Sequence, residues 1–368
     1  QAGRQARVLD SRAKTDRRWI AVKVAIVGAT GAVGTEFLTL LEERSLPVTS
    51  LRAFASPRSA GRTVSYAGQE VVVEPLPEDG NLGADVVFSS AGGSVSLAGA
   101  WRWVEHGAAV VDNTSAWRMD ERVPLVVPEV NPEALEGHQG VIANPNCSTI
   151  IALMALAPLH RAFGLKRAVV ATYQAVSGAG LWGIEELRRQ TAAALAGEPV
   201  QPEKFKHQIA FNVFSHDSAV GDDGYNAEER KLLLESRKIL GLPDLAVSAT
   251  CVRVPVYRAH SEAIHASFER PVTADAAREV LAASPGVRVV DDRDGNTFPM
   301  PLDAAGKDDT LVGRLREDTA LPNGLALFVS GDQIRKGAAL NAVQIAETLF
   351  GVVPATAKRA ENASPVAV

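Results

Sequence analysis

The chain has 368 residues, 46% of them hydrophobic and 22% charged, which can bury a sizeable core and indicates two domains of ordinary size. Its formal net charge of −5 shows no basic excess, so we expect no nucleic-acid partner; a local phosphate-binding pocket is still compatible with this charge. No run of about 18 apolar residues occurs, so no membrane span is predicted. The two cysteines lack the spacing of a disulfide framework or zinc site, which predicts free thiols, no metal and a reducing, cytoplasmic compartment.

The two ends of the chain differ in character from the rest. Residues 1–21 are rich in basic side chains and lack the apolar middle of a secretory signal, so we interpret them as a disordered extension, with a targeting segment as the alternative. Residues 353–368 are interpreted as a second loose tail.

Residues 22–148 alternate between strand and helix patterns. The run "VKVAIVGATGAVG" is an apolar, β-branched strand followed by a glycine turn, and "TEFLTLLEER" continues with helical periodicity. Further strands are predicted at 48–56, 84–92 and 107–116, with a helix at 96–107. Alternation of this kind predicts a Rossmann-like, doubly wound parallel sheet that binds a dinucleotide.

Residues 149–335 follow a different pattern, typical of an α+β domain rich in antiparallel strands. A helix is predicted over 148–163 and a charged amphipathic helix over 226–240; strands are predicted within 166–180, 245–269 and 324–333. A last helix, 336–352, is expected to return to the first domain and complete it.

The glycine turn is the first candidate binding site. Gly28, Gly31 and Gly34 form GxxGxxG between a strand and a helix, where backbone N–H groups can approach a pyrophosphate; a purely structural tight turn is the alternative. After the second strand, "FASPRSAG" offers Ser56, Arg58 and Ser59, which suit a 2′-phosphate better than a ribose hydroxyl. We therefore predict NADP rather than NAD.

Cys147 is the candidate nucleophile. It precedes the apolar run "STIIALMALAPLHRAF", at the junction of the two domains, and the N-terminus of a helix favours a thiolate. A small packed residue is the competing interpretation. A thiol beside a nicotinamide points to hydride transfer at the thioester or hemithioacetal level, which needs a proton donor or acceptor. His260, just past an apolar strand, fits that need; the other six histidines are interpreted as structural or solvated.

Three charged residues are candidate substrate ligands. Arg253 lies within a strand, where a guanidinium needs a partner, either a substrate carboxylate or an internal carboxylate. Glu228 and Lys231 share a helix face, where they hold an ammonium and a phosphate or form an ordinary ion pair. Cys251 lies on the same strand face as Arg253, and we interpret it as a packing residue.

Read together, these motifs resemble the aspartate-semialdehyde dehydrogenases over about residues 22–352. The matching segments, in chain order, are "GATGAVG", "SPRSAG", "FSSAGG", "DNTSAWRMD", "VPEVN", "NPNCSTI", "YQAVSGAG", "EERK", "RVPVYRAHSEA" and "KGAALNAVQIAE". The resemblance implies reversible, NADP-dependent reductive dephosphorylation of L-aspartyl 4-phosphate to L-aspartate 4-semialdehyde through a cysteine thioester. It also implies a place upstream of lysine or diaminopimelate, methionine, threonine and isoleucine, and a homodimer built through the second domain, with a tetramer as the alternative.

The resemblance also implies roles for individual residues. Cys147 is the nucleophile, Asn146 helps to form the anion pocket, Gln174 orients the substrate or a water, and His260 is the acid/base. Arg253 binds the substrate carboxylate and Glu228 its ammonium group. Arg118 and Lys231 bind the phosphate. The implied cofactor contacts are Gly28, Thr30, Gly31, Ala32, Val33, Gly34, Ser56, Arg58, Ser59, Ser177, Gly178 and Asn341.

Three other functions share parts of this pattern. N-acetyl-γ-glutamyl-phosphate reductase performs the same chemistry on a longer acyl phosphate, and glyceraldehyde-3-phosphate dehydrogenase has similar thiol chemistry. A catalytically silent dinucleotide-binding regulator would keep the fold, but Cys147, Gln174, Arg253 and His260 are all present, which favours an enzyme.

Overall fold

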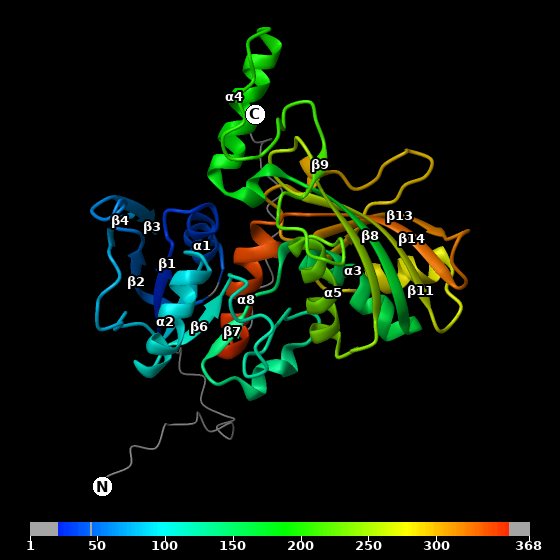
Figure 1. Cartoon of the computed structure of the whole chain (residues 1–368). Coiled ribbons are helices and arrows are strands. Elements are labelled where there is room, and N and C mark those ends of the chain that lie inside the picture. Colours follow the sequence, from blue (N-terminus) through cyan, green and yellow to red (C-terminus); the bar gives the residue numbers. More distant parts are fainter. Residues whose placement is uncertain (1–20, 45, 353–368) are drawn as a thin grey trace.

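The computed structural model of the protein describes residues 21–44 and 46–352, which form two seven-stranded sheets (Figure 1). The predictions of an extension and a tail fall mainly on residues outside these ranges. The predicted fold class, a Rossmann-like doubly wound sheet plus a second α+β domain, is confirmed. No helix within the described ranges has both the length and the apolar character that a membrane span requires.

The first sheet has the strand order β3-β4-β2-β1-β5-β6-β7. Its elements and connections are β1 (Val22–Val27), α1 (Ala32–Glu43), β2 (Val48–Phe54), β3 (Thr63–Tyr66), β4 (Gln69–Glu74), β5 (Val86–Ser89), α2 (Gly93–Glu105), β6 (Ala109–Asp112), the 3₁₀ turn η1 (Pro132–Gly137) and β7 (Val141–Ala143). All neighbouring strands are parallel except the β3–β4 hairpin at the edge. Because β1 pairs with both β2 and β5, the chain reverses direction across the sheet there, at the position where doubly wound folds bind ligands.

Burial on both faces explains the apolar strands of this sheet. Val24 and Ile26 of β1 join a core with α1 and with α8 (Leu340–Leu349), whereas Ala25 and Val27 join a core with α2. The last helix therefore does pack on the first sheet, preceded by a π-helical turn, η3 (Arg335–Ala339).

The second sheet has the order β12-β13-β14-β11-β8-β10-β9. Its elements are α3 (Cys147–Phe163), β8 (Leu165–Gln174), the 3₁₀ turn η2 (Val176–Ala179), α4 (Leu181–Leu195), β9 (Phe214–Ser215), α5 (Ala227–Leu240), β10 (Ala246–Arg253), β11 (His260–Phe268), α6 (Ala274–Ala282), β12 (Val287–Val289), α7 (Pro301–Ala304), β13 (Thr310–Glu317) and β14 (Gly324–Gly331). The β8–β10 and β12–β13 pairs are parallel and the others antiparallel.

Helices α3, α5 and α6 lie on one face of this sheet, and α4 projects away from the rest of the chain (Figure 1). The twelve residues Ser148–Leu159 of α3 are all buried, so this helix is apolar on every side and joins the two domains. The three catalytic candidates Gln174, Arg253 and His260 stand at the ends of β8 and β10 and the start of β11, the three adjacent central strands.

Candidate active site

The GxxGxxG turn has the geometry of a nucleotide-binding loop. Gly28 has a φ of +94°, and a Cβ there would lie 3.0 Å from the backbone nitrogen of Ala91. A Cβ on Gly34 would collide with the Gly28 carbonyl oxygen and lie 2.7 Å from the Ala29 Cα, so only glycine lets α1 approach β1 this closely. The helix N-terminus and its N–H groups therefore face the end of β1, as a dinucleotide requires.

The segment predicted to read the cofactor's ribose lies where expected. Ser56, Arg58 and Ser59 follow β2, which ends at Phe54, and Ser56 and Arg58 are exposed. Among the described residues, no acidic side chain pairs with Arg58, so its guanidinium is available to an anion. Its cofactor contact stays a prediction.

Cys147 is the first residue of α3, as the sequence predicted, and is partly exposed. The preceding residue, Asn146, caps the helix: its side-chain oxygen accepts hydrogen bonds from the backbone nitrogens of Ser148 and Thr149 at 3.1 and 3.3 Å. Gly337, in the π-helical turn η3, lies against the thiol-bearing residue, since a Cβ there would be 3.0 Å from the Cys147 Cβ. Two segments far apart in sequence thus meet at the thiol.

The electrostatic state of Cys147 differs from the sequence expectation of a stabilised thiolate. Burial and the Glu228 carboxylate raise the pKa of the Cys147 thiol to about 12, and the opposing effects of Arg118 and Lys231 are weaker. The Ser148 N–H also lowers this pKa, but it does not outweigh burial and Glu228. A thiol with this pKa is protonated at neutral pH.

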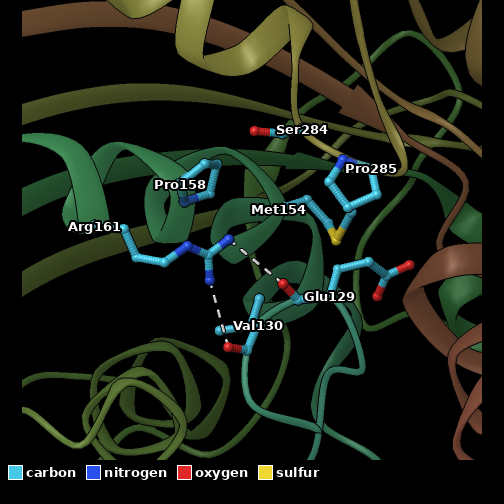
Figure 2. Close-up of a pocket in the computed structure, with 7 residues that line it drawn as sticks. All are labelled: Glu129, Val130, Met154, Pro158, Arg161, Ser284 and Pro285. Carbon is cyan, nitrogen blue, oxygen red and sulfur yellow. Dashed lines mark hydrogen bonds between the residues drawn. The ribbon is translucent and has the colours of Figure 1, made fainter. Parts of the chain in front are cut away.

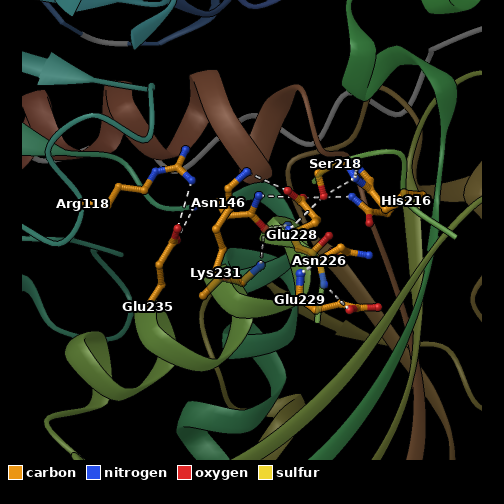
Figure 3. Close-up of polar contacts among 12 residues, drawn as sticks. Arg118, Asn146, His216, Ser218, Asn226, Glu228, Glu229, Lys231 and Glu235 are labelled. Atoms are coloured by element: carbon orange, nitrogen blue, oxygen red, sulfur yellow. Dashed lines mark hydrogen bonds and ion pairs between the residues drawn. The ribbon is translucent and has the colours of Figure 1, made fainter. Parts of the chain in front are cut away.

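Glu228 is the centre of the polar cluster in Figure 3. Its Oε1 accepts from Asn146 Nδ2 at 2.8 Å and from Gln174 Nε2 at 3.2 Å, and its Oε2 accepts from Lys231 Nζ at 2.8 Å. Burial opposes ionisation, but the charge of Lys231 and these hydrogen bonds hold the pKa of Glu228 below its ordinary value. Glu228 and Lys231 do share a helix face, and Glu228 is buried rather than solvated.

Arg118 reaches the same cluster from the first domain. Its three nitrogens donate to the carbonyl oxygens of Asn144 and Asn113 and, from Nη1, to Glu235 Oε1 at 3.0 Å. The other oxygen of Glu235 accepts from the backbone nitrogen of Asn146 at 2.6 Å. A guanidinium has five N–H donors, so two stay available to an anion. Glu235, which the sequence patterns did not single out, thus links Arg118 to the residue before the cysteine.

His260 begins β11 and is fully buried, with its Nδ1 accepting from the backbone nitrogen of Ala175 at 2.9 Å. The Ala175 N–H leaves the proton of a neutral ring on Nε2, and this nitrogen has no hydrogen-bond partner among the described residues. Burial and the charge of Arg253 lower the pKa of His260 to about 3. The ring is therefore neutral and presents an N–H donor.

Arg253 lies at the end of β10 with only 3% of its surface exposed. Its Nη1 donates to the Ala175 carbonyl at 2.9 Å and its Nη2 to His216 Nε2 at 2.9 Å, and within the described part of the chain its Nε has no partner. The Asp217 carboxylate, at 3.9 Å, is too distant to hydrogen-bond with it. The internal carboxylate considered as an alternative is thus present only at long range.

Gly178 lies directly against both Arg253 and His260. A Cβ at this position would be 3.2 Å from Arg253 Nη1 and 3.4 Å from His260 Nε2. Its neighbour Ser177 accepts a hydrogen bond from Gln333 Nε2, and Gln333 Oε1 accepts from the Ala259 nitrogen at 2.8 Å. The segment before η3 thereby ties the η2 turn to the residue preceding His260.

Two further candidates have structural contacts of their own. Asn341 is fully buried; its Nδ2 donates to the Val126 carbonyl and to Asn144 Oδ1, and its Oδ1 accepts from Lys336 Nζ. These bonds give both polar atoms of the Asn341 side chain partners within the protein, and a contact of Asn341 with the cofactor stays a prediction. Cys251 is buried on the same strand face as Arg253 and belongs to the hydrophobic core, as its packing interpretation expects.

A small cavity elsewhere on α3 is not part of this site (Figure 2). Met154 and Pro158 line it from α3, one or more turns beyond Cys147, and Arg161 points to the carbonyl oxygens of Glu129 and Val130. The Glu129 carboxylate is already paired with Lys336. Within the described part of the chain, no group of three or more His, Cys, Asp or Glu side chains could hold a metal.

The two domains match known protein families. A family model described as "Semialdehyde dehydrogenase, NAD binding domain" matches residues 23–138, and one described as "Semialdehyde dehydrogenase, dimerisation domain" matches residues 156–336. Together with the glycine turn and the cysteine at the domain junction, these matches define a two-domain semialdehyde dehydrogenase.

Individual relatives narrow this class. The chain is 51% identical over 332 residues to an aspartate-semialdehyde dehydrogenase of Synechocystis sp., covering 89% of this chain and 97% of that protein. The crystal structure of aspartate semialdehyde dehydrogenase II from Vibrio cholerae complexed with ASA aligns with a TM-score of 0.87 at 45% identity, over 90% of this chain and 98% of that one. The crystal structure of aspartate semialdehyde dehydrogenase with NADP from Candida albicans aligns with a TM-score of 0.71 at 28% identity, over 90% of this chain and 100% of that one. The chain belongs to the aspartate-semialdehyde dehydrogenase family.

Proposed function

We propose that the protein catalyses the reversible, NADP-dependent reductive dephosphorylation of L-aspartyl 4-phosphate to L-aspartate 4-semialdehyde through a thioester on Cys147. The activity would serve biosynthesis of lysine or diaminopimelate, methionine, threonine and isoleucine, in the cytoplasm. Family membership supports the activity. The observation that carries the substrate assignment is Arg253, a buried guanidinium to which no carboxylate of residues 21–44 or 46–352 hydrogen-bonds. It lies on the face of the sheet that also presents His260 and Gln174.

The charged groups match a zwitterionic acyl phosphate. Arg253 would bind the substrate carboxylate and Glu228 its ammonium group, while Arg118, through its two spare N–H donors, and Lys231 would bind the phosphate. An ammonium beside Glu228 would offset the carboxylate charge that, together with burial, raises the pKa of Cys147. Substrate binding would thus favour the reactive thiolate.

The reaction balances with these residues. Cys147 Sγ attacks the acyl carbon, the bond to phosphate breaks, and the departing phosphate takes the thiol proton. When bound, the nicotinamide cofactor supplies the hydride that reduces the thioester. The hemithioacetal oxyanion then collapses to the aldehyde, and the released Cys147 thiolate takes up a proton.

His260 would act at the acyl oxygen. Its Nε2–H can donate to the oxyanion, and a donor of this kind accelerates acyl transfer about 10²- to 10³-fold. To accept a proton at Nε2 the ring must carry its own proton on Nδ1, and to donate one as an acid it must carry a second proton there; either breaks the hydrogen bond from the Ala175 nitrogen. Gln174, fixed by Thr172 and Glu228, would orient the substrate or a water, and Asn146 would contribute to the anion pocket.

The cofactor would lie between the glycine turn and the thiol. Gly28, Thr30, Gly31, Ala32, Val33 and Gly34 would hold its pyrophosphate, Ser56, Arg58 and Ser59 its 2′-phosphate, and Ser177 and Gly178 its nicotinamide end, with Asn341 as a further contact. The absence of a Cβ at Gly28, Gly34 and Gly178 supports this placement, because side chains there would fill the space beside the backbone or the catalytic groups.

Dimerisation would use the second domain. α4 and the loop packed on it expose large apolar side chains, namely Leu181 (54%), Trp182 (68%), Leu195 (76%), Phe211 (67%) and Val213 (60%). Exposed apolar side chains of this size mark interaction surfaces, and the dimerisation-domain match supports pairing here. Analytical ultracentrifugation should give a dimer that Trp182→Asp dissociates; a tetramer stays a prediction.

The substrate assignment is tested by phosphate-dependent reduction of NADP. L-Aspartate 4-semialdehyde should be the better substrate, with N-acetylglutamate 5-semialdehyde and glyceraldehyde 3-phosphate as comparisons. A preference for either comparison aldehyde would overturn the assignment. No activity with any of them, with NADP still bound, would favour the silent regulator.

A further inference from the structure

His216 is in direct contact with the candidate carboxylate-binding group, although its sequence context gave no reason to separate it from the structural histidines. It follows β9, which pairs with β10 at Val252 and Arg253. Its backbone nitrogen donates to the Cys251 carbonyl at 2.8 Å, so it is held beside the strand that carries Arg253. Figure 3 shows its ring with Ser218 next to Glu228.

The contact fixes the protonation of the His216 ring. The guanidinium of Arg253 can only donate, so His216 Nε2, 2.9 Å from Arg253 Nη2, must accept and carry no proton. The proton of the neutral ring is then on Nδ1, where it can be donated to Ser218 Oγ at 3.1 Å. The Ser218 nitrogen, 3.3 Å from Nδ1, could donate only to an unprotonated Nδ1, so the tautomer set by Arg253 excludes that hydrogen bond. Ser218 Oγ also accepts from the Glu228 nitrogen at 3.2 Å. His216 is thereby connected to the start of α5.

Neutral acceptors suit a guanidinium that must bind a further anion. Arg253 is held by the Ala175 carbonyl on Nη1 and by His216 on Nη2, and its Cζ lies 5.6 Å from the centre of the Phe205 ring. None of these contacts neutralises its charge. A carboxylate in the place of His216 would orient Arg253 equally well but would cancel the charge that a substrate carboxylate needs.

We propose that His216 is a positioning residue for substrate recognition: as a neutral hydrogen-bond acceptor it orients Arg253 toward the substrate carboxylate and releases it when protonated. The inference rests on the proposed function, because it takes the α-carboxylate of the substrate as the ligand of Arg253. It predicts an effect on KM for carboxylate-bearing substrates rather than on the chemical step.

Protonation of His216 would weaken this arrangement. The charged and titratable groups around the ring are Arg253 of β10, Asp217 of its own loop, Glu228 and Lys231 of α5, and His260 of β11. Burial and Arg253 lower the pKa of His216 below its ordinary value, against the opposing effects of Glu228 and Asp217. The neutral form is therefore present at pH 7 and lost as the pH falls through this lowered pKa.

The test compares wild type with His216→Gln, whose side-chain oxygen can accept from Arg253 but cannot titrate, and His216→Leu, which has no acceptor. At pH 8 we expect His216→Leu to raise KM for L-aspartate 4-semialdehyde about tenfold with little change in kcat, and His216→Gln to stay close to wild type. As the pH falls through the lowered pKa of His216, KM should rise for wild type more than for His216→Gln. Propanal, which lacks the carboxylate, should be oxidised equally by all three.

Three results would overturn the inference: an unchanged KM in His216→Leu, an equal loss with propanal, or the same pH profile of KM in wild type and His216→Gln. The second of these would mean that the substitution disturbs the site as a whole. An inactive wild type would instead refute the proposed function on which the inference depends, so the two failures are distinguishable.

Discussion

Replacing Glu235 should damage both stability and phosphate recognition, because this carboxylate satisfies two buried donors. Glu235 is 2% exposed, and its oxygens accept from Arg118 Nη1 at 3.0 Å and from the Asn146 nitrogen at 2.6 Å. Glu235→Leu leaves a buried backbone N–H without a partner, which costs about 1–3 kcal/mol, and a buried guanidinium without its carboxylate. Since Arg118 keeps two carbonyl partners, we expect a total loss of about 3–5 kcal/mol.

Glu235→Gln is the matched control. Its single amide oxygen can replace one carboxylate oxygen, but its NH₂ group faces the other donor, so one of the two bonds is lost at a cost of about 1–2 kcal/mol. Urea denaturation followed by tryptophan fluorescence would measure both losses. The KM for phosphate should rise in both variants, and more in Glu235→Leu than in Glu235→Gln, because Arg118 loses its orienting partner. The reasoning is refuted if both variants unfold within about 0.5 kcal/mol of wild type.

Three further expectations concern the thiol and the cofactor loop. The rate of inactivation by iodoacetamide should rise about tenfold per pH unit up to pH 10 and keep rising, because burial and Glu228 raise the pKa of Cys147 to about 12. Glu228→Gln removes the nearby negative charge and should shift this pH profile to lower pH. A profile that does not move would contradict the assigned cause. Gly34→Ala should lower the free energy of unfolding by about 1–3 kcal/mol and weaken NADP binding, whereas Gly31→Ala, where a Cβ would make only a 3.4 Å contact, should be much milder in a thermal melt. Arg58→Ala should raise the Kd for NADP in titration calorimetry by about tenfold or more and leave that for NAD nearly unchanged; equal effects on both would remove Arg58 from the 2′-phosphate site.

Local patterns in the sequence were sufficient to predict the parts of the fold that depend on local chemistry. The apolar run before Gly28 and the helix after Cys147 are both where periodicity placed them. The β3–β4 hairpin, α4, α6 and the β12–β13 pair were not predicted, because their short or mixed patterns acquire meaning only through partners distant in sequence. The parallel pairing of β8 with β10 inside a mostly antiparallel sheet depends on such partners as well.

The candidate site shows the same division. The residues singled out by type and position, Cys147, Arg253 and Glu228, belong to one polar cluster whose charges influence one another. Glu235 and His216 were missed, since a glutamate in a charged helix and one of seven histidines carry no local signal. Their contacts with Arg118 and Arg253 exist only in the folded chain. The protonated thiol was likewise not foreseen, because helix position predicts stabilisation, whereas burial and the neighbouring carboxylate oppose it in the folded chain.

The most direct test of the account is to trap the acyl group on the protein. Mixing the enzyme with L-aspartate 4-semialdehyde and NADP in the absence of phosphate should produce a rapid burst of about one NADPH per subunit, because the thioester forms but has no phosphate acceptor. Intact-protein mass spectrometry and peptide mapping should then locate a hydroxylamine-sensitive acyl group on Cys147, and Cys147→Ser should give neither burst nor adduct. Steady NADPH production without phosphate and without an adduct, or an adduct on Cys251, would contradict the account.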